Sequence, residues 1–276
     1  MCIDLNDNLS VRGMLPYLLD ESVSDRIIIH ASLESTNDTA KELAVSGARH
    51  GTVVMADYQT AGKGRYGRSF FSPPGHGVYM SFILHQASLL WGGIPTLATA
   101  HAAVSVCEAI EATTGKTPQI KWVNDVLLDG KKICGILTEA VTDSKNGIMP
   151  WIVVGIGVNF ITPGNGYPEE IRNVAGSLFS EGDPSITRSR LAAELVNRML
   201  SERGEGANVN RMLDEYRKRL VMLGKTVTVT RANLSFEATA IDIDNTGRLI
   251  VKKDNGEILS LDSGEISITS LLFTDV

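Results

Sequence analysis

A short glycine-rich segment with interleaved basic residues is the part of this sequence that most clearly indicates chemistry. Residues 61–68 read Ala-Gly-Lys-Gly-Arg-Tyr-Gly-Arg. The glycines let a backbone approach a ligand closely, and the basic side chains supply positive charge. The chain has a formal net charge of -6, yet positions 58–107 contain no Asp or Glu. A basic island in an acidic protein predicts a small anionic ligand such as a phosphate, because nucleic-acid binding spreads positive charge over a larger face.

The glycine spacing matches the dinucleotide-binding fingerprint, but its surroundings do not. That fingerprint needs a helix that opens at the third glycine and an acidic residue about 20 positions later. Pro73 and Pro74 block the helix, and the next acidic residue is Glu108. A Walker A loop is also excluded, because the lysine is followed by glycine and Asp57 stands where the first glycine belongs. A phosphate-binding loop and an exposed flexible loop remain as alternatives.

Two further clusters of polar residues flank a predicted hairpin. Asn124 and Asp125 lie just before it and could face Mg²⁺ through oxygen, although an ordinary Asx turn explains the pair equally simply. Lys131 and Lys132 begin its second strand, and Gly135 would allow close approach of a ligand. Charged residues that protect a solvated sheet edge are the structural alternative.

Two polar segments could hold a neutral ligand. Residues 35–37 are Ser-Thr-Asn, which offer hydroxyls and an amide, or could simply cap a helix. Asn159 ends an apolar strand, where its amide could both donate and accept hydrogen bonds or occupy a turn. The five histidines show no metal-ligand spacing, so a metal-hydrolase site has no support.

The elements that must position these residues follow from apolar periodicity and turn residues. A capping box at Thr39–Glu42 predicts a helix that runs toward Gly47, and Pro95 predicts a long helix that ends before Gly115. Further helices are expected at 11–19, 188–203 and 209–223. Strands are expected at 27–30, 52–56, 78–84 and 151–158, and Asp129-Gly130 joins strands 126–128 and 131–138 as a hairpin. Residues 162–187 are expected to form loops.

The pattern of residues changes after position 223, from helical periodicity to short alternating segments separated by turns. Residues 226–230 alternate with period two, and turns follow at 245–247 and 255–256. Short strands at this spacing predict a small all-β barrel. The expected class is therefore α+β, with a first domain over residues 1–223 and a small all-β barrel over residues 224–276.

Composition suits a soluble globular protein. The chain has 276 residues, of which 43% are hydrophobic and 21% charged. Its apolar runs are shorter than the roughly 18 residues of a membrane span, and its acidic N-terminus lacks the pattern of a signal peptide. Three scattered cysteines predict neither a disulfide framework nor a metal knuckle. We expect a cytoplasmic protein that binds neither membrane nor nucleic acid.

In order along the chain, these segments resemble the biotin–protein ligases. The resemblance implies that residues 1–223 form a mixed-sheet catalytic domain with a fold similar to that of class II synthetases, and that residues 224–276 form an SH3-like barrel. Each motif alone is weak, but their shared order is specific. The matching segments are 35–37 (Ser-Thr-Asn), 58–68, 71–73 (Phe-Ser-Pro), 121–125 (Lys-Trp-Val-Asn-Asp), 131–137, 155–159 and 264–267. The resemblance implies that biotin and MgATP form biotinyl-5′-AMP, and that biotin is then transferred to one lysine of a biotin carboxyl carrier protein or domain.

The resemblance also assigns residues. Those implied to bind biotin are Ser35, Thr36, Asn37, Gln59, Lys63, Gly64, Arg65, Lys132 and Gly135. Those implied to bind ATP are Gly62, Arg68, Phe70, Asn124, Asp125 and Asn159. The catalytic residues would be Lys132, Arg65 and Arg68, and the residues facing Mg²⁺ would be Asp125 and Asn124.

The chemistry of that reaction fits the basic segment. A carboxylate and a triphosphate must be brought together, so fixed cations must offset their repulsion and the charge that grows on the α-phosphate. Holding the reactants in place contributes up to about 7–11 kcal/mol in favourable cases. A glycine-rich loop that closes over the mixed anhydride would shield it from water.

Some features separate this chain from its relatives or leave alternatives open. Lys63 stands where many members carry Arg, which keeps the charge but loses the bidentate fork. Position 123 is Val where the family often has Pro. About 26 residues precede the first predicted strand, fewer than the roughly 50 of a DNA-binding domain, so we expect a monofunctional enzyme. A lipoate–protein ligase and a non-catalytic biotin or nucleotide sensor are the competing hypotheses, and the oligomeric state, including a homodimer, stays open.

Overall fold

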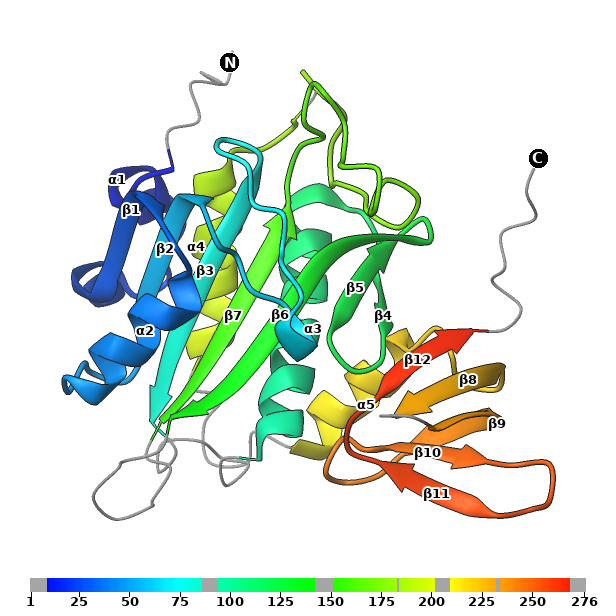
Figure 1. Cartoon of the computed structure of the whole chain (residues 1–276). Coiled ribbons are helices and arrows are strands. Elements are labelled where there is room, and N and C mark those ends of the chain that lie inside the picture. Colours follow the sequence, from blue (N-terminus) through cyan, green and yellow to red (C-terminus); the bar gives the residue numbers. More distant parts are fainter. Residues whose placement is uncertain are drawn as a thin grey trace.

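The computed structural model describes residues 9–85, 94–141, 151–182, 184–201, 209–231 and 234–268. Its main feature is a seven-stranded sheet with the strand order β1-β2-β3-β7-β6-β5-β4 (Figure 1). The strands are β1 (Ile27–Leu33), β2 (Thr52–Gln59), β3 (Gly77–His85), β4 (Gln119–Lys121), β5 (Asp125–Leu128), β6 (Lys131–Val141) and β7 (Trp151–Asn159).

The sheet is mixed, as predicted. β1 and β2 pair in parallel, and the other neighbours pair antiparallel. Parallel neighbours need a crossover connection, which α2 (Thr36–Val45) supplies between them. The predicted hairpin joins β5 to β6, and Asp129 and Gly130 both have positive φ there (50° and 76°), as a primed turn requires.

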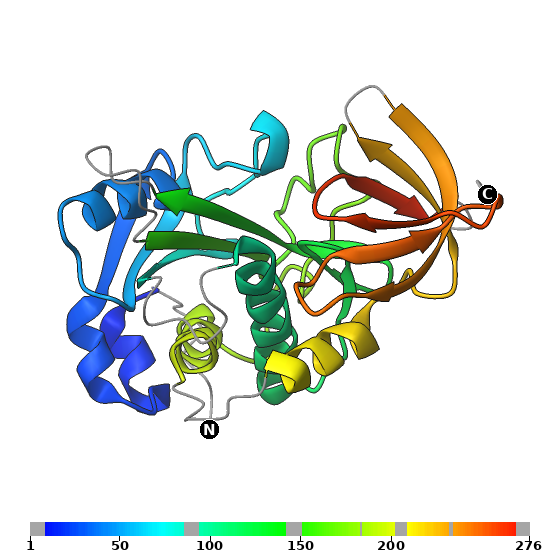
Figure 2. The same ribbon diagram turned by 90° about the horizontal axis from the view of Figure 1, so that it is seen from below.

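The two faces of the sheet bury different partners. Side chains alternate along each strand, so Met80 and Phe82 of β3 join the large core behind the sheet, while Ile83 joins a small core in front of it. Ala40 and Ala44 of α2 complete the small core. Figure 2 shows α2 and residues 60–70 on one side of the sheet, and the long helices on the other.

The large core lies under α3 (Pro95–Thr114) and α4 (Arg188–Leu200). α3 begins at Pro95 and ends at Thr114, just before Gly115, whose φ of 71° is left-handed, so both ends were predicted correctly. Many of its buried residues are alanines, and small side chains let this helix pack closely on the sheet and on α4. No helix in the described part of the chain is long and apolar enough to cross a membrane.

The capping box predicted at Thr39–Glu42 is wrong, and α2 instead begins after Ser35, one of the capping residues offered at 35–37. The helix begins at Thr36, so Thr39 lies inside it and the expected capping box does not form. Ser35 is the N-cap residue, yet its side chain makes no capping hydrogen bond. The backbone N–H of Thr36 instead donates to Gln59 Oε1 at 2.8 Å. A side chain from β2 therefore satisfies the exposed donor that a local cap usually takes.

The second sheet is antiparallel and has the order β11-β10-β9-β8-β12. Its strands are β8 (Thr226–Arg231), β9 (Leu234–Ile243), β10 (Leu249–Lys252), β11 (Ile258–Leu261) and β12 (Glu265–Ile268). The alternation at 226–230 predicted β8 correctly. The recorded pairings among described residues do not join β11 to β12, so closure into a barrel stays a prediction.

Helix α5 (Val209–Arg219) connects the two sheets. It was predicted to run to position 223, but the chain leaves the helix after Arg219 because Val221 N donates to Ile120 O of β4 at 2.9 Å. Arg217 donates to Asp242 Oδ1 at 2.6 Å and to Ile243 O at 3.1 Å. Trp122 Nε1 donates to Gly247 O at 3.0 Å. Both sheets are thus held against this junction.

The remaining predicted elements match in part. Residues 11–19 form a short helix, α1 (Val11–Met14), followed by a 3-10 turn (Leu15–Tyr17), and a second 3-10 segment (Glu21–Arg26) leads into β1. α4 ends at Leu200, and positions 202–203 of its predicted span lie outside the described residues. The loop-rich stretch from 162 contains no helix in its described part.

The hydrogen bond made by Tyr216 of α5 can be used to test the junction between the two sheets. Its side chain is fully buried, and its hydroxyl donates to Val123 O at 2.8 Å. Tyr216→Phe should lower the free energy of unfolding by about 1–2 kcal/mol, because a buried carbonyl loses its partner. Urea denaturation measures this, and Tyr17→Phe at a half-exposed site is the control. Equal midpoints for the Tyr216 variant and the unmodified protein would contradict the assignment.

Candidate active site

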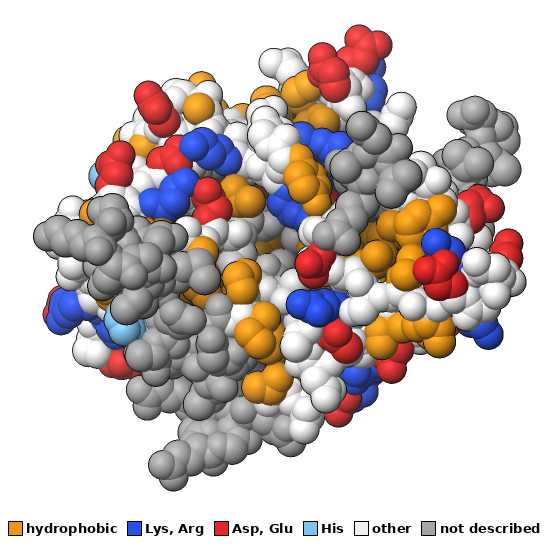
Figure 3. Space-filling model, turned by 60° about the horizontal axis from the view of Figure 1, so that its bottom comes forward, with side chains coloured by type: hydrophobic (Ala, Val, Ile, Leu, Met, Phe, Trp, Pro, Cys, Tyr) orange, Lys and Arg blue, Asp and Glu red, His pale blue; other side chains and the backbone are white. Residues whose placement is uncertain are grey.

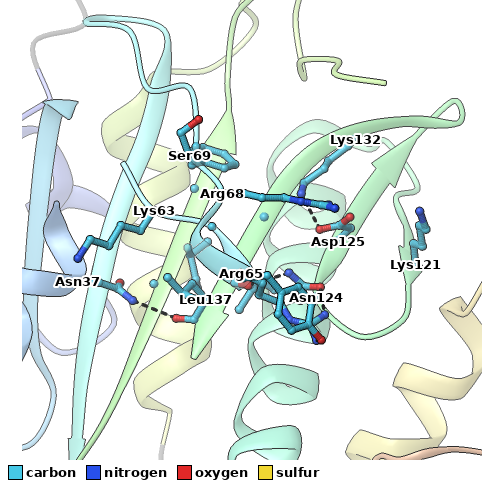
Figure 4. A pocket seen from close by; sticks show the side chains of 18 of the residues that line it. Asn37, Lys63, Arg65, Arg68, Ser69, Lys121, Asn124, Asp125, Lys132 and Leu137 are labelled. Carbon is cyan, nitrogen blue, oxygen red and sulfur yellow. Dashed lines mark hydrogen bonds and ion pairs between the residues drawn. The ribbon is translucent and has the colours of Figure 1, made fainter. Parts of the chain in front are cut away.

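A cavity of about 300 Å³ opens on the front face of the large sheet, between α2, the glycine loop (residues 61–70) and the β4–β5 turn (Figure 4). Most of the predicted site residues line it. They are Ser35, Thr36, Asn37, Gln59, Lys63, Gly64, Arg65, Arg68, Phe70, Asn124, Asp125, Lys132 and Gly135. Gly62 and Asn159 are not among its lining residues.

One end of the cavity is polar and uncharged. Thr36 N and Oγ1 both donate to Gln59 Oε1, at 2.8 and 3.1 Å. Gln59 Nε2 donates to Ser72 Oγ at 2.9 Å. Ser81 Oγ lies 2.8 Å from Thr36 Oγ1 and 2.6 Å from Asn37 Oδ1. These buried groups fix one another before any ligand arrives, which gives a preorganised set of donors and acceptors.

Glycines form the floor of the cavity. A Cβ at Gly155 would lie 2.1 Å from Asn37 Oδ1, and one at Gly157 would lie 2.5 Å from the Phe70 ring. A Cβ at Gly135 would meet the same ring at 3.0 Å. Strand alternation places all three on the front face, so the missing side chains make room for Asn37 and Phe70.

The glycine loop is a compact hairpin. Gly64 N donates to Arg68 O at 2.6 Å, and Phe70 N donates to Gly62 O at 2.8 Å. Its tip is a single 3-10 turn (Arg65–Gly67), in which Tyr66 takes a left-handed conformation with a φ of 56°. Strain of this kind in a non-glycine residue needs support from contacts around it.

Tyr66 has that support. Its hydroxyl accepts from Arg65 Nη2 at 2.9 Å and from Gly264 N at 3.1 Å. Arg65 also donates through Nη1 to Asn124 Oδ1 at 3.0 Å. The tip of the loop therefore contacts both the β4–β5 turn and the second sheet. Figure 4 shows Arg65 and Asn124 side by side.

Lys132 points into the cavity, where Nζ lies 2.7 Å from Asp125 Oδ1 (Figure 4). Its backbone is anchored on both sides, because Lys132 N donates to Val174 O at 2.7 Å and Gly176 N donates to Lys132 O at 2.9 Å. Asn159 Nδ2 donates to Gly176 O at 2.9 Å. Asn159 thus holds the segment beneath Lys132 in this structure, and its contact with a nucleotide stays a prediction.

Four charged residues in a row border the polar end. Lys63 pairs with Asp38 at 2.6 Å, Asp38 with Lys41 at 3.0 Å, and Lys41 with Glu139 at 2.8 Å. Burial raises the pKa of Asp38, but hydrogen bonds from Lys63 and Lys41 outweigh it and hold that pKa below its usual value. Burial lowers the pKa of Lys41, yet hydrogen bonds from Glu139 and Asp38 raise it above its usual value. Both groups are therefore charged at neutral pH.

The residues at the β4–β5 turn fit a metal ion that arrives with a nucleotide. Asp125 offers a half-buried carboxylate, whereas Asn124 is already fixed: Nδ2 donates to Ile136 O at 3.0 Å and Oδ1 accepts from Arg65. Mg²⁺ commonly takes only one or two protein carboxylates and binds phosphates and water besides. Within the described residues, no group of three or more His, Cys, Asp or Glu side chains forms a metal cluster. Asp125 is the better of the two predicted ligands.

Several residues of the site were not predicted from the sequence. Ser81 is the polar residue within the otherwise apolar run 78–84, and that contrast could have identified it. Glu139 follows Gly135 by four positions, so strand alternation places both on one face. Lys121 and Leu137 also line the cavity. Tyr66 and Gly264 are 198 positions apart, and local patterns give no indication of their contact.

A polar neutral end, a basic loop and a lysine–aspartate pair within one cavity suit a ligand with a neutral ring and a reactive anion beside a phosphate. This arrangement and the mixed sheet agree with a known family. The model of the Biotin/lipoate A/B protein ligase family matches residues 29–159, and that of the Biotin protein ligase C terminal domain matches residues 222–268. The chain belongs to the biotin/lipoate protein ligase family and carries the C-terminal domain of its biotin branch.

Individual relatives of known name support the same family assignment. The chain is 34% identical over 243 residues to the bifunctional ligase/repressor BirA of Bacillus subtilis, over 87% of this chain and 73% of the relative. It is 30% identical over 267 residues to the biotin–[acetyl-CoA-carboxylase] ligase of Mycobacterium tuberculosis, over 91% and 96% of the two chains.

Solved structures share the fold. A biotin protein ligase from Aquifex aeolicus in complex with biotin and ATP superposes with a TM-score of 0.72 at 24% identity, over 88% of this chain and 97% of that one. A biotin acetyl coenzyme A carboxylase synthetase from Helicobacter pylori with biotinylated ATP gives a TM-score of 0.60 at 18% identity, over 85% and 98% of the two chains.

The glycine floor can be tested at Gly155. In Gly155→Ala the new methyl must push Asn37 away from Ser81, so biotin binding should weaken about tenfold to 100-fold, as expected when buried hydrogen bonds are lost. Isothermal titration calorimetry with biotin measures the change. Gly164→Ala is the control, because its Cβ would meet only the flexible end of Glu181. Unchanged affinity in Gly155→Ala would show that the position of Asn37 is unimportant.

Proposed function

We propose that this protein is an ATP-dependent, AMP-forming biotin–protein ligase. It activates biotin with MgATP to biotinyl-5′-AMP and transfers biotin to a lysine of a biotin carboxyl carrier protein or domain. The observation that carries the proposal is one cavity in which the neutral Thr36–Gln59–Asn37 network lies beside Arg65 and Lys132. Such a site suits a ligand that has an uncharged polar ring at one end and a reacting carboxylate at the other.

The polar end is assigned to the biotin ring. Its ureido group has two N–H donors and one carbonyl acceptor, and the cavity supplies hydroxyls and amides for both. The residues assigned to the ring are Ser35, Thr36, Asn37 and Gln59. Those assigned to its carboxylate and the adjoining phosphate are Lys63, Gly64, Arg65, Lys132 and Gly135.

The other end is assigned to ATP. Phe70, whose ring lies against Gly135 and Gly157, is assigned to the adenine, and Gly62 lies against its backbone: a Cβ at Gly62 would lie 2.5 Å from Phe70 O. The side chain of Arg68 extends toward Lys132 and Asp125 in Figure 4, on the side assigned to the phosphates. Asp125, with Asn124 and Asn159 near it, completes this end. Mg²⁺ held by Asp125 would neutralise phosphate charge.

The first step forms one bond and breaks one. A carboxylate oxygen of biotin attacks the α-phosphorus of ATP, the bond between that phosphorus and the bridging oxygen breaks, and pyrophosphate leaves with the electron pair. Lys132, Arg65 and Arg68 stabilise the negative charge on the α-phosphate oxygens. In the second step the amine of the carrier lysine attacks the carboxyl carbon, loses a proton and releases AMP.

Several attributes accompany this function. The partner is a carrier protein that presents a lysine, and two relatives are named biotin–[acetyl-CoA-carboxylase] ligases.

A cytoplasmic location is supported by the free buried thiols of Cys107 and Cys134. β1 ends the large sheet with an open edge, which supports a homodimer. We place the boundary between a catalytic domain (1–223) and a C-terminal module (224–276) at the turn after α5.

The decisive experiment supplies ATP, carrier domain and either biotin or lipoate. Labelling with biotin, together with biotin-dependent release of pyrophosphate, is the expected result. Labelling with lipoate alone would favour a lipoate ligase, and biotin binding without pyrophosphate release would favour a sensor. The match to the biotin protein ligase C-terminal domain already weighs against a lipoate ligase.

Lys132→Ala should slow adenylate formation by about 100- to 1,000-fold, because it removes one fixed donor from the developing charge. Single-turnover measurement of biotinyl-AMP tests this, and circular dichroism checks that the variant is folded. Lys131→Ala is the control, since that neighbouring Nζ donates to Asn173 O outside the cavity. Normal turnover in a folded Lys132→Ala variant would refute the assignment.

Arg65→Gly should release the adenylate faster, by about tenfold, because the loop loses its bond to Asn124 and its tip loses the internal bond between Arg65 and Tyr66. Rapid dilution of the preformed complex, followed by quantification of free biotinyl-AMP, gives the rate. A dissociation rate equal to that of the unmodified enzyme would show that the loop does not retain the product.

A further inference from the structure

The row of charges beside the cavity connects the glycine loop to the polar end. Its members, Lys63, Asp38, Lys41 and Glu139, alternate in sign and are here called the ion-pair chain. Lys63 belongs to the loop, Asp38 and Lys41 to α2, and Glu139 to β6. All four side chains are partly buried, with exposures of 28–46%. The ion-pair chain therefore connects three separate segments of the protein on one side of the cavity.

Its inner end contacts Asn37. Glu139 uses one carboxylate oxygen for Lys41 and the other, Oε2, to accept from Asn37 Nδ2 at 2.8 Å. The same amide nitrogen donates to Leu137 O at 3.2 Å (Figure 4). Both N–H bonds of Asn37 are thus engaged. Its Oδ1 accepts one hydrogen bond from Ser81 Oγ at 2.6 Å, so the second lone pair of Oδ1 is what remains for a ligand.

Glu139 fixes which way this amide faces. A flipped Asn37 would turn Oδ1 toward two acceptors, the Leu137 carbonyl and the Glu139 carboxylate, and both contacts would be repulsive. Gly155 leaves just enough room for Oδ1 in the observed orientation. With the amide held in this way, Asn37 can accept a hydrogen bond from a ligand but cannot donate one.

We propose that Glu139 is a positioning residue that makes Asn37 select ligands with ring N–H groups, and that the ion-pair chain connects this selection to the glycine loop through Lys63. The inference rests on the proposed function and deepens it. A ureido ring offers N–H donors to a fixed acceptor, whereas the dithiolane ring of lipoate offers none. Glu139 therefore favours the biotin ring without touching it.

Two substitutions of Glu139 separate the two parts of the proposal, the positioning of Asn37 and the connection to the glycine loop. Glu139→Ala removes both the partner of Asn37 and the partner of Lys41. Glu139→Gln keeps an acceptor for Asn37 in its amide oxygen but loses the ion pair, so Lys41 turns fully to Asp38 and competes with Lys63 for it. Glu42→Ala is the matched control. Glu42 lies on α2 next to Lys41, its side chain is exposed, and it forms no ion pair with another described residue.

The first measurement is the preference for biotin over its two mono-N-methyl ureido analogues, determined by calorimetry on the full chain. The unmodified protein should prefer biotin by about tenfold or more over at least one analogue, since one hydrogen bond to a fixed acceptor is lost. Glu139→Ala should reduce this preference toward one and raise the KM for biotin about tenfold, with kcat within about twofold. Glu139→Gln and Glu42→Ala should retain the preference.

The second measurement is the release rate of preformed biotinyl-AMP. Glu139→Gln should release it several-fold faster than Glu42→Ala, although both retain the preference for biotin. Full preference in a folded Glu139→Ala, loss of preference in Glu139→Gln, or a Glu42→Ala effect of the same size would overturn the proposal. If Glu139→Ala does not fold, Glu139→Gln decides through the release rate alone.

Failure of this inference can be told apart from failure of the proposed function. An unmodified protein that forms no biotinyl-AMP would refute the ligase function, whatever the variants do. An active protein whose preference for biotin is insensitive to Glu139→Ala would leave the ligase function standing and remove only the positioning role.

Discussion

Repulsion among cations is the constraint on which this structure depends. Lysine and arginine side chains must converge on one small cavity to handle an anionic ligand, and before it arrives each needs an acceptor to hold it in place. Lys63 has Asp38, Arg65 has Asn124, and Lys132 has Asp125. These acceptors come from α2 and the β4–β5 turn, so the protein framework sets the positions of the charges. The phosphates can then take over partners that are already oriented.

The large sheet can hold this polar cavity because its two faces differ: one face builds the main hydrophobic core and the other carries the site. Behind it, closely packed apolar side chains under α3 and α4 provide the main core, while the front face carries only a small core beneath α2. Where that small core ends, glycines replace side chains and the cavity begins. Mixed charges also characterise the outer surface: Figure 3 shows Lys and Arg interspersed with Asp and Glu over the face it presents. On the face shown, Lys and Arg therefore do not form one continuous basic patch.

Much of the fold followed from local patterns, and much of the site from motifs. Short apolar runs and the Asp129-Gly130 turn predicted β3, β5, β6 and β7 well, because these signals lie within a few neighbouring residues. The capping box at Thr39 was wrong, because Gln59, which is distant in sequence, satisfies the first N–H of α2. Ser81 interrupts an apolar run and could have been identified, whereas Glu139 contacts Asn37 from 102 positions away, which local patterns do not show. Barrel closure and the domain boundary remain predictions.

The contact between Tyr66 and Gly264 gives the second sheet a part in timing. A loop tip that rests on another module opens only as often as that contact breaks. If the loop retains the adenylate as proposed, the dwell time of that intermediate depends on this contact. Gly264, Ile266 and Ser267 also line the cavity, so a module far from the glycine loop in sequence forms part of the wall of the site.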